Sequence, residues 1–126
     1  MRKMRFVCSA LLLAAGAAWS AETEMDTDLM RAIEDANKSL SSDIALKNTK
    51  GALADAKELE DMFIKVEGFF NDKAEAHDAV ELSKKSVELT RGISKSVSSG
   101  DFDGATDAAT NLSRTCRSCH TFYKKS

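Results

Sequence analysis

The sequence predicts an all-α protein, an antiparallel up-down-up-down four-helix bundle. Proline is absent from all 126 residues, and the good helix formers Ala, Leu, Lys and Glu are abundant, so local propensity favours helix almost throughout. Apolar residues recur at spacings of three and four in four separate stretches, as expected when each helix buries one stripe. Short breaks separate these stretches, and short connections make neighbouring helices antiparallel.

Each of the four stretches defines one expected buried stripe. The stripes are Leu29, Ile33, Ala36, Leu40 and Ile44; Ala52, Ala56, Leu59, Phe63, Val66 and Phe70; Ala79, Leu82, Ser86, Leu89, Ile93 and Val97; and Ala105, Ala109, Leu112, Cys116, Cys119 and Tyr123. Residues 48–51 separate the first two helices, Asn71 and Asp72 are expected to cap the third, and Gly100 precedes the fourth. One helix of this size cannot bury its stripe alone, so we expect the four to pack together.

Residues 1–20 differ from the rest of the chain and are typical of a secretory signal peptide. Three basic residues near the start are followed by an apolar run over residues 6–18 and by small residues at Ala18 and Ser20. The apolar run is shorter than the roughly 20 residues that a bilayer crossing needs. We therefore expect cleavage after Ser20, leaving residues 21–126 as one exported domain without stable membrane insertion.

The charge balance argues against nucleic acid as a partner. The chain has 18 Lys and Arg against 20 Asp and Glu, and removal of residues 1–20 takes the formal net charge from −2 to −5. Nucleic-acid binding requires clustered Lys and Arg. The sequence also shows no acid–base pair, no Ser/His/Asp arrangement and no phosphate-binding glycine loop, so we do not expect an enzyme.

The segment Cys116-Arg117-Ser118-Cys119-His120 is the C-x-x-C-H pattern of c-type haem attachment. Two cysteines three residues apart lie on one side of a helix, where both sulfurs can add to the vinyl groups of one porphyrin. The imidazole of His120 can then bind the iron as the proximal ligand. We therefore expect one covalent haem c on the last helix.

Two other uses of these cysteines are less consistent with the sequence. A dithiol redox pair usually precedes a helix within a βαβ pattern, and no stretch alternates like a strand. A zinc site needs a fourth ligand and usually a second Cys or His pair. Apart from His120, the only histidine is His77, and the third cysteine, Cys8, lies in the signal peptide.

With four short helices and this motif near its C-terminus, the chain resembles the class II c-type cytochromes, that is, cytochrome c prime and its Met-ligated relatives. The resemblance covers residues 25–125. Its most specific part is the cluster Arg114, Cys116, Cys119, His120, Tyr123 and Lys124. The resemblance implies a four-helix bundle with the haem attached to the last helix, present as a monomer or a homodimer.

In that family, a residue of the first helix faces the iron from the far side: Met in electron carriers, and Leu or an aromatic residue in five-coordinate members. The resemblance implies that Met30 takes this position and that Arg31 pairs with a haem propionate. Met30 as an ordinary core residue, Met25 as the ligand, or His77 as a second histidine ligand stay open. Met62 is expected in the core.

These features together predict a periplasmic c-type cytochrome that carries single electrons and docks briefly with redox partner proteins. The alternative is a five-coordinate protein whose open distal position binds nitric oxide or carbon monoxide. A third interpretation is an accessory haem subunit of a larger membrane-bound oxidoreductase.

Overall fold

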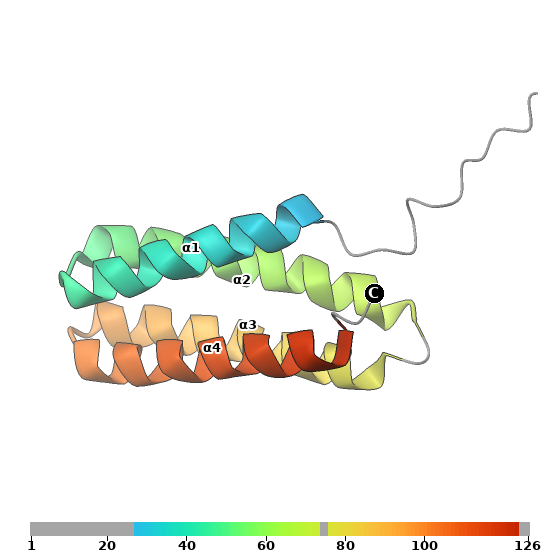
Figure 1. Ribbon diagram of the computed structural model, residues 1–126. Helices are drawn as coiled ribbons and strands as arrows, with labels where there is room; N and C mark the ends of the chain where they lie inside the picture. The colour runs from blue at the N-terminus through green and yellow to red at the C-terminus, as the bar shows by residue number, and fades with distance from the viewer. Residues whose placement is uncertain (1–26, 74–75, 124–126) are drawn as a thin grey trace, which may run out of the picture.

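Four α-helices pack against one another in the computed structural model, which describes residues 27–73 and 76–123, with side chains as far as His120. The helices are α1 (Thr27–Ala45), α2 (Thr49–Asn71), α3 (His77–Ser98) and α4 (Phe102–Tyr123). They alternate in direction and form two layers, α1 with α2 and α3 with α4 (Figure 1). The described residues contain no strand, so the all-α four-helix architecture is confirmed.

The segment 1–20, predicted to be a signal peptide, and Met25 lie outside the described residues. Within 27–73 and 76–123, no helix is both long and apolar enough to cross a membrane.

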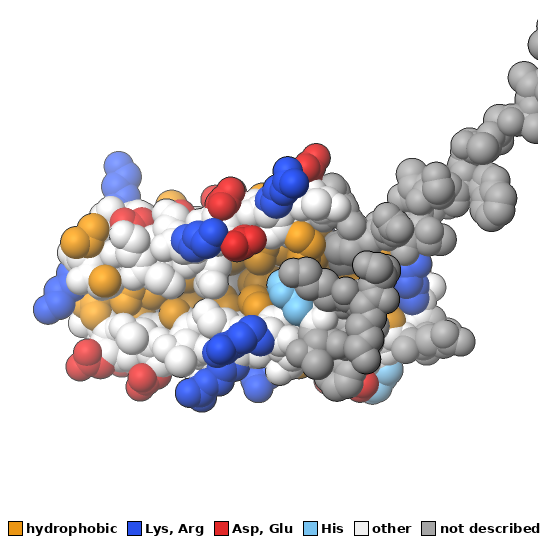
Figure 2. Space-filling model, in the orientation of Figure 1, with side chains coloured by type: hydrophobic (Ala, Val, Ile, Leu, Met, Phe, Trp, Pro, Cys, Tyr) orange, Lys and Arg blue, Asp and Glu red, His pale blue; other side chains and the backbone are white. Residues whose placement is uncertain are grey.

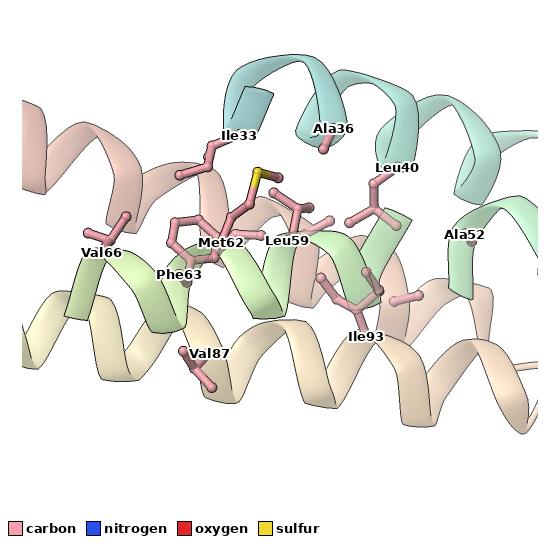
Figure 3. Packing of buried hydrophobic residues seen from close by; sticks show 14 of the residues in the cluster. Ile33, Ala36, Leu40, Ala52, Leu59, Met62, Phe63, Val66, Val87 and Ile93 are labelled. Carbon is pink, nitrogen blue, oxygen red and sulfur yellow. The ribbon is translucent and has the colours of Figure 1, made fainter. Parts of the chain in front are cut away.

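One apolar core runs through the bundle, and every helix contributes to it. The largest fully buried side chains are those of Leu40, Leu59, Ile93, Leu112, Val97 and Thr90. Figure 3 shows Leu40 of α1 and Leu59 of α2 pointing into the space between the helices. The stripe predicted for α2 is buried in full, and that of α1 is buried from Ile33 to Ile44, with Leu29 half-buried. Fully burying such a side chain stabilises the fold by about 1.5–3 kcal/mol.

The buried face of α3 is wider than predicted. Leu82 and Leu89, expected at its centre, are only partly buried, because the helix turns four other residues inward. These are Val80, Ser83, Val87 and Thr90. The hydroxyls of Ser83 and Thr90 donate to main-chain carbonyls three or four residues earlier, at 2.6 and 2.7 Å. A hydroxyl satisfied within its own helix can be buried without losing a hydrogen bond.

Polar caps and one glycine build the turn between α1 and α2. Asn48 is the N-cap of α2, and its Oδ1 accepts from the backbone N–H of Gly51 at 3.3 Å. Its Nδ2 donates to Oδ1 of Asp43 at 2.9 Å. A Cβ at position 51 would collide with the Asp43 carboxylate and the Asn48 amide, so glycine allows these two side chains to keep their positions in the turn.

The turn before α4 was predicted correctly, whereas the cap expected for α3 was not. Gly100 adopts a positive φ of 76°, and Oδ1 of Asp101 accepts from the backbone N–H of Gly104 at 2.9 Å. Asn71, in contrast, is the last residue of α2 and Asp72 is its C-cap. The N-cap of α3 is Ala76, which makes no side-chain cap hydrogen bond, because α3 begins only at His77, beyond the two polar residues that were expected to cap it.

Asp55 of α2 is a half-buried acid next to α1. Its Oδ2 is shielded from solvent and has no hydrogen-bond partner among the described residues. Burial is the main reason that the pKa of Asp55 is raised, and the carboxylates of Asp43 and Glu58 raise it further, against a hydrogen bond from Ser39 that lowers it.

Leu40→Ala should lower the free energy of unfolding by about 2–5 kcal/mol, because it leaves a cavity in a closely packed core. Urea denaturation followed by circular dichroism measures this loss. Leu46, just after α1, is 75% exposed and supplies the control: Leu46→Ala should change stability by less than about 0.5 kcal/mol. Equal losses for both variants would contradict the core described above.

Asp55→Asn should stabilise the protein more at pH 7 than at pH 4. A raised folded pKa means that the folded state holds this proton more tightly than the unfolded chain does. The contribution of Asp55 to the free energy of unfolding is therefore fully present below the unfolded pKa of about 3.9, where the carboxyl is protonated in both states. This contribution is lost as the pH rises through the raised folded pKa, because the ionised carboxylate is disfavoured in the folded protein. Urea denaturation at both pH values measures the difference, with the exposed Asp107→Asn as control. An effect of Asp55→Asn that does not vary with pH would refute this account.

Candidate cofactor site between α1 and α4

The C-x-x-C-H motif lies in the last two turns of α4. Its cysteines continue the buried side of the helix beyond Leu112, and both are half-buried free thiols. Cys116 packs against the apolar core. His120, one residue after Cys119, is exposed. One helix end therefore offers two thiols that face inward and an imidazole beside them.

Burial disfavours the thiolate form of both cysteines. Burial raises the pKa of Cys116 to about 11, with a smaller contribution from the neighbouring Cys119. Burial also raises the pKa of Cys119. A dithiol that exchanges disulfides relies on a lowered pKa, because the thiolate is the nucleophile. The environment of these two cysteines is the opposite of what a redox dithiol pair requires.

A hydrogen bond between Asn37 and Ser113 shows which sides of α1 and α4 face each other. Asn37 Nδ2 donates to Ser113 Oγ at 3.4 Å, a long bond but one that joins the two helices directly. Next to it, towards the turns, a shallow groove of about 260 Å³ lies between α1 and α4. Its walls are Ser41, Ile44, Ala45, Thr106, Ala109, Thr110 and Ser113. These residues identify the side of each helix that faces the other.

Met30 and His120 lie further along these same sides of α1 and α4. Residues seven apart are nearly two helical turns apart and lie on almost the same side of a helix. Met30 is seven residues before Asn37, and His120 is seven residues after Ser113. Because α1 and α4 are antiparallel, both steps lead towards the same end of the bundle, by about 10.5 Å each. Helix geometry therefore predicts that Met30 and His120 lie at the same level, on the sides of α1 and α4 that face each other.

The two helices are less tightly joined at that level. Figure 1 shows α1 and α4 close together near the turns and spreading apart towards the start of α1. Among the described residues, α1 and α4 also contact each other less than any other pair of neighbouring helices does. Figure 2 shows hydrophobic side chains visible from outside along the seam between α1 and α4, with a histidine beside it. Met30 is half-buried there and packs against the core.

The residues that line this seam fit a haem. The set of donor groups is two thiols spaced for vinyl attachment, an imidazole beside them and a thioether on the opposite helix, which are the groups that c-type haem uses. Oδ1 of Asn37, at the inner end of the seam, is shielded from solvent and has no hydrogen-bond partner among the described residues. In the described part of the chain, no three His, Cys, Asp or Glu side chains form a cluster that could hold a bare metal ion.

The other residues singled out in the sequence lie in different surroundings. Arg31 is exposed and follows Met30 on α1. Met62 is buried, with 6% of its surface exposed, and its side chain points from α2 towards α1 (Figure 3). His77 is the exposed first residue of α3, on neither of the helices that line the seam. Met62 is therefore a core residue, as predicted.

Sequence analysis missed Asn37 and Ser113. Both are small polar residues outside the apolar stripes, so periodicity gave no reason to select them. The only available signal was their spacing of seven residues from Met30 and His120.

Comparisons with known proteins gave no match: no family model, no curated protein and no solved structure matches this chain. The sequence motif and the packing of α1 on α4 are therefore what support a function.

Proposed function

We propose that the protein is an exported, periplasmic c-type cytochrome that carries single electrons, with one haem bound covalently through Cys116 and Cys119. The imidazole of His120 and the thioether of Met30 would bind its iron. The observation that supports this best is the hydrogen bond between Asn37 of α1 and Ser113 of α4, since Met30 and His120 each lie seven residues from one of these partners, towards the same end of the bundle.

Each of these residues has a distinct part in holding the cofactor. The sulfurs of Cys116 and Cys119 would hold the haem through thioether bonds that prevent its loss, and the imidazole of His120 would donate to its iron. The bound haem supplies an iron that alternates between the ferrous and ferric states. The thioether of Met30 favours the ferrous state and so raises the reduction potential. The guanidinium of Arg31, exposed beside Met30, is available for a charge-assisted hydrogen bond to a propionate.

Expression in a host that matures c-type cytochromes should give a coloured protein with the mass of residues 21–126 plus one haem. The haem should stay attached after denaturation, because two thioether bonds hold it. Mass spectrometry and the absorption spectrum measure both properties. The double substitution Cys116→Ser with Cys119→Ser should abolish covalent attachment, whereas Ser118→Ala, between the two cysteines and exposed, should preserve it. A colourless product with the mass of the bare polypeptide would refute the proposal.

Met30→Leu should remove the sulfur-to-iron charge-transfer band of the ferric protein and make its iron high-spin, because leucine cannot donate to the metal. The ferrous variant should then bind carbon monoxide rapidly. Met62→Leu is the matched control, since Met62 lies in the core, and its spectrum should match that of the wild type.

A wild-type protein that is already high-spin and binds carbon monoxide rapidly would instead favour the five-coordinate gas-binding alternative. Retention of the charge-transfer band in Met30→Leu would show that another residue is the sixth ligand.

A further inference from the structure

Leu46, directly after α1, is an exposed leucine beside a groove that its own side chain does not enter. It is 75% exposed, and in the described part of the chain the only other exposed large hydrophobic residue is Ile64 of α2, at 45%. The backbone N–H of Leu46 donates to the carbonyl of Ser42 at 3.0 Å, which continues the last turn of α1. Successive residues of a helix point about 100° apart. Because Ala45 lines the groove between α1 and α4, Leu46 points away from it.

The groove can accept an apolar side chain without leaving a polar group unpaired. Three hydroxyl groups in its walls, those of Ser41, Thr106 and Thr110, donate to main-chain carbonyls of their own helices at 2.9–3.0 Å. The fourth, that of Ser113, accepts from Asn37. These groups lose no hydrogen bond when an apolar group covers them. The other walls are apolar, and the volume of about 260 Å³ exceeds that of a leucine side chain.

Opposite charges accompany the leucine and the groove. Lys47 comes directly after the exposed leucine, whereas Asp103 and Asp107 lie near the start of α4, seven and three residues before Thr110 in the groove wall. All three charged side chains are exposed, and among the described residues none lies within ion-pair distance of an opposite charge. Arg114, the next cation along α4, lies one turn beyond Thr110, away from the turns. The groove is therefore acidic at its end nearest the turns.

The leucine, the groove and both signs of charge lie at one end of the molecule. Figure 2 shows hydrophobic, basic and acidic side chains together at the turn end of the face that carries the seam between α1 and α4. A surface that contains both a projecting side chain and the groove that fits it is complementary to itself. Self-complementarity is what a two-fold interface between identical chains requires.

We propose that the protein forms a symmetric homodimer through this end of α1 and α4. Leu46 of each copy enters the groove of the other copy, and Lys47 of each copy faces Asp103 and Asp107 of the other. The surface is small, so the association is weak and reversible. It lies at the opposite end of the bundle from Met30 and His120, so both candidate cofactor sites stay uncovered. The inference does not depend on the proposed function, because it uses no residue of the cofactor site.

Sedimentation equilibrium of the purified protein, at concentrations from about 10 µM to about 1 mM, tests the dimer. The average mass should rise with concentration from that of one chain towards that of two. Leu46→Ala should raise the dissociation constant at least about tenfold, because each dimer loses two buried leucine side chains. This variant keeps its fold, since Leu46 makes little contact within its own chain. Ile64→Ala, at the other exposed hydrophobic residue, is the matched control and should leave the constant unchanged.

Charge reversal tests the pairing of Lys47 with the acids beside the groove. Lys47→Glu should raise the dissociation constant at low salt by about threefold or more, and so should the double substitution Asp103→Lys with Asp107→Lys. A chain with all three substitutions restores opposite charges across the interface and should recover most of the lost affinity. Higher salt should reduce all these differences, because it screens the charges.

A protein that keeps the mass of one chain at about 1 mM would overturn the proposal. So would a dimer that Ile64→Ala disrupts and Leu46→Ala does not, because its interface would then lie on α2. A triple charge variant no tighter than the single and double variants would refute the pairing of Lys47 with Asp103 and Asp107. The haem spectrum decides the proposed function separately, so the two inferences can fail independently.

Discussion

The antiparallel packing of α1 against α4 is the constraint on which the candidate site depends. Neither helix contains the site alone, since α4 supplies two thiols and an imidazole and α1 supplies the thioether. Their direct link is the long hydrogen bond from Asn37 to Ser113, which is too weak to set the register by itself. The register instead follows from the apolar residues beside this bond, above all Leu40 and Leu112, which are fully buried and cannot slip by one turn without losing their packing.

The fold was predictable because apolar periodicity reports burial directly. The stripes of α1 and α2 repeat without interruption and are the ones found in the core. At α3 the prediction was right for Ala79, Ser86, Ile93 and Val97 but missed other buried residues. Two of these are Ser83 and Thr90. A hydroxyl that bonds its own helix behaves as a small core residue, and a hydropathy pattern cannot distinguish it from a solvated one. The cap of α3 was wrong for a related reason, because Asn71 is as compatible with the end of one helix as with the start of the next.

The site was only partly predictable. Cys116, Cys119 and His120 follow from a short motif whose spacing is dictated by the porphyrin. The choice of Met30 came from a resemblance, since a single methionine on an amphipathic helix is more often a packing residue. The sequence alone does not show which residue of α1 lies level with His120. Two antiparallel helices with the same stripes can pack in registers one turn apart, and the choice depends on contacts with all the neighbouring helices. In the folded bundle, the hydrogen bond between Asn37 and Ser113 shows which register the two helices adopt.

The two ends of the bundle differ in how completely they are packed. The largest fully buried side chains lie in the middle of the bundle and towards the turns joining α1 to α2 and α3 to α4, whereas Met30 and Cys116, towards the other end, are only half-buried. A closed, well-packed half can hold the helices together while the other half leaves Met30 and Cys116 only partly covered. Under the proposed function, the cofactor would cover these side chains and so complete the core. Because the proposed thioether bonds would keep the haem attached to the unfolded chain as well, it would stabilise the fold only through the apolar contacts that it makes in the folded state.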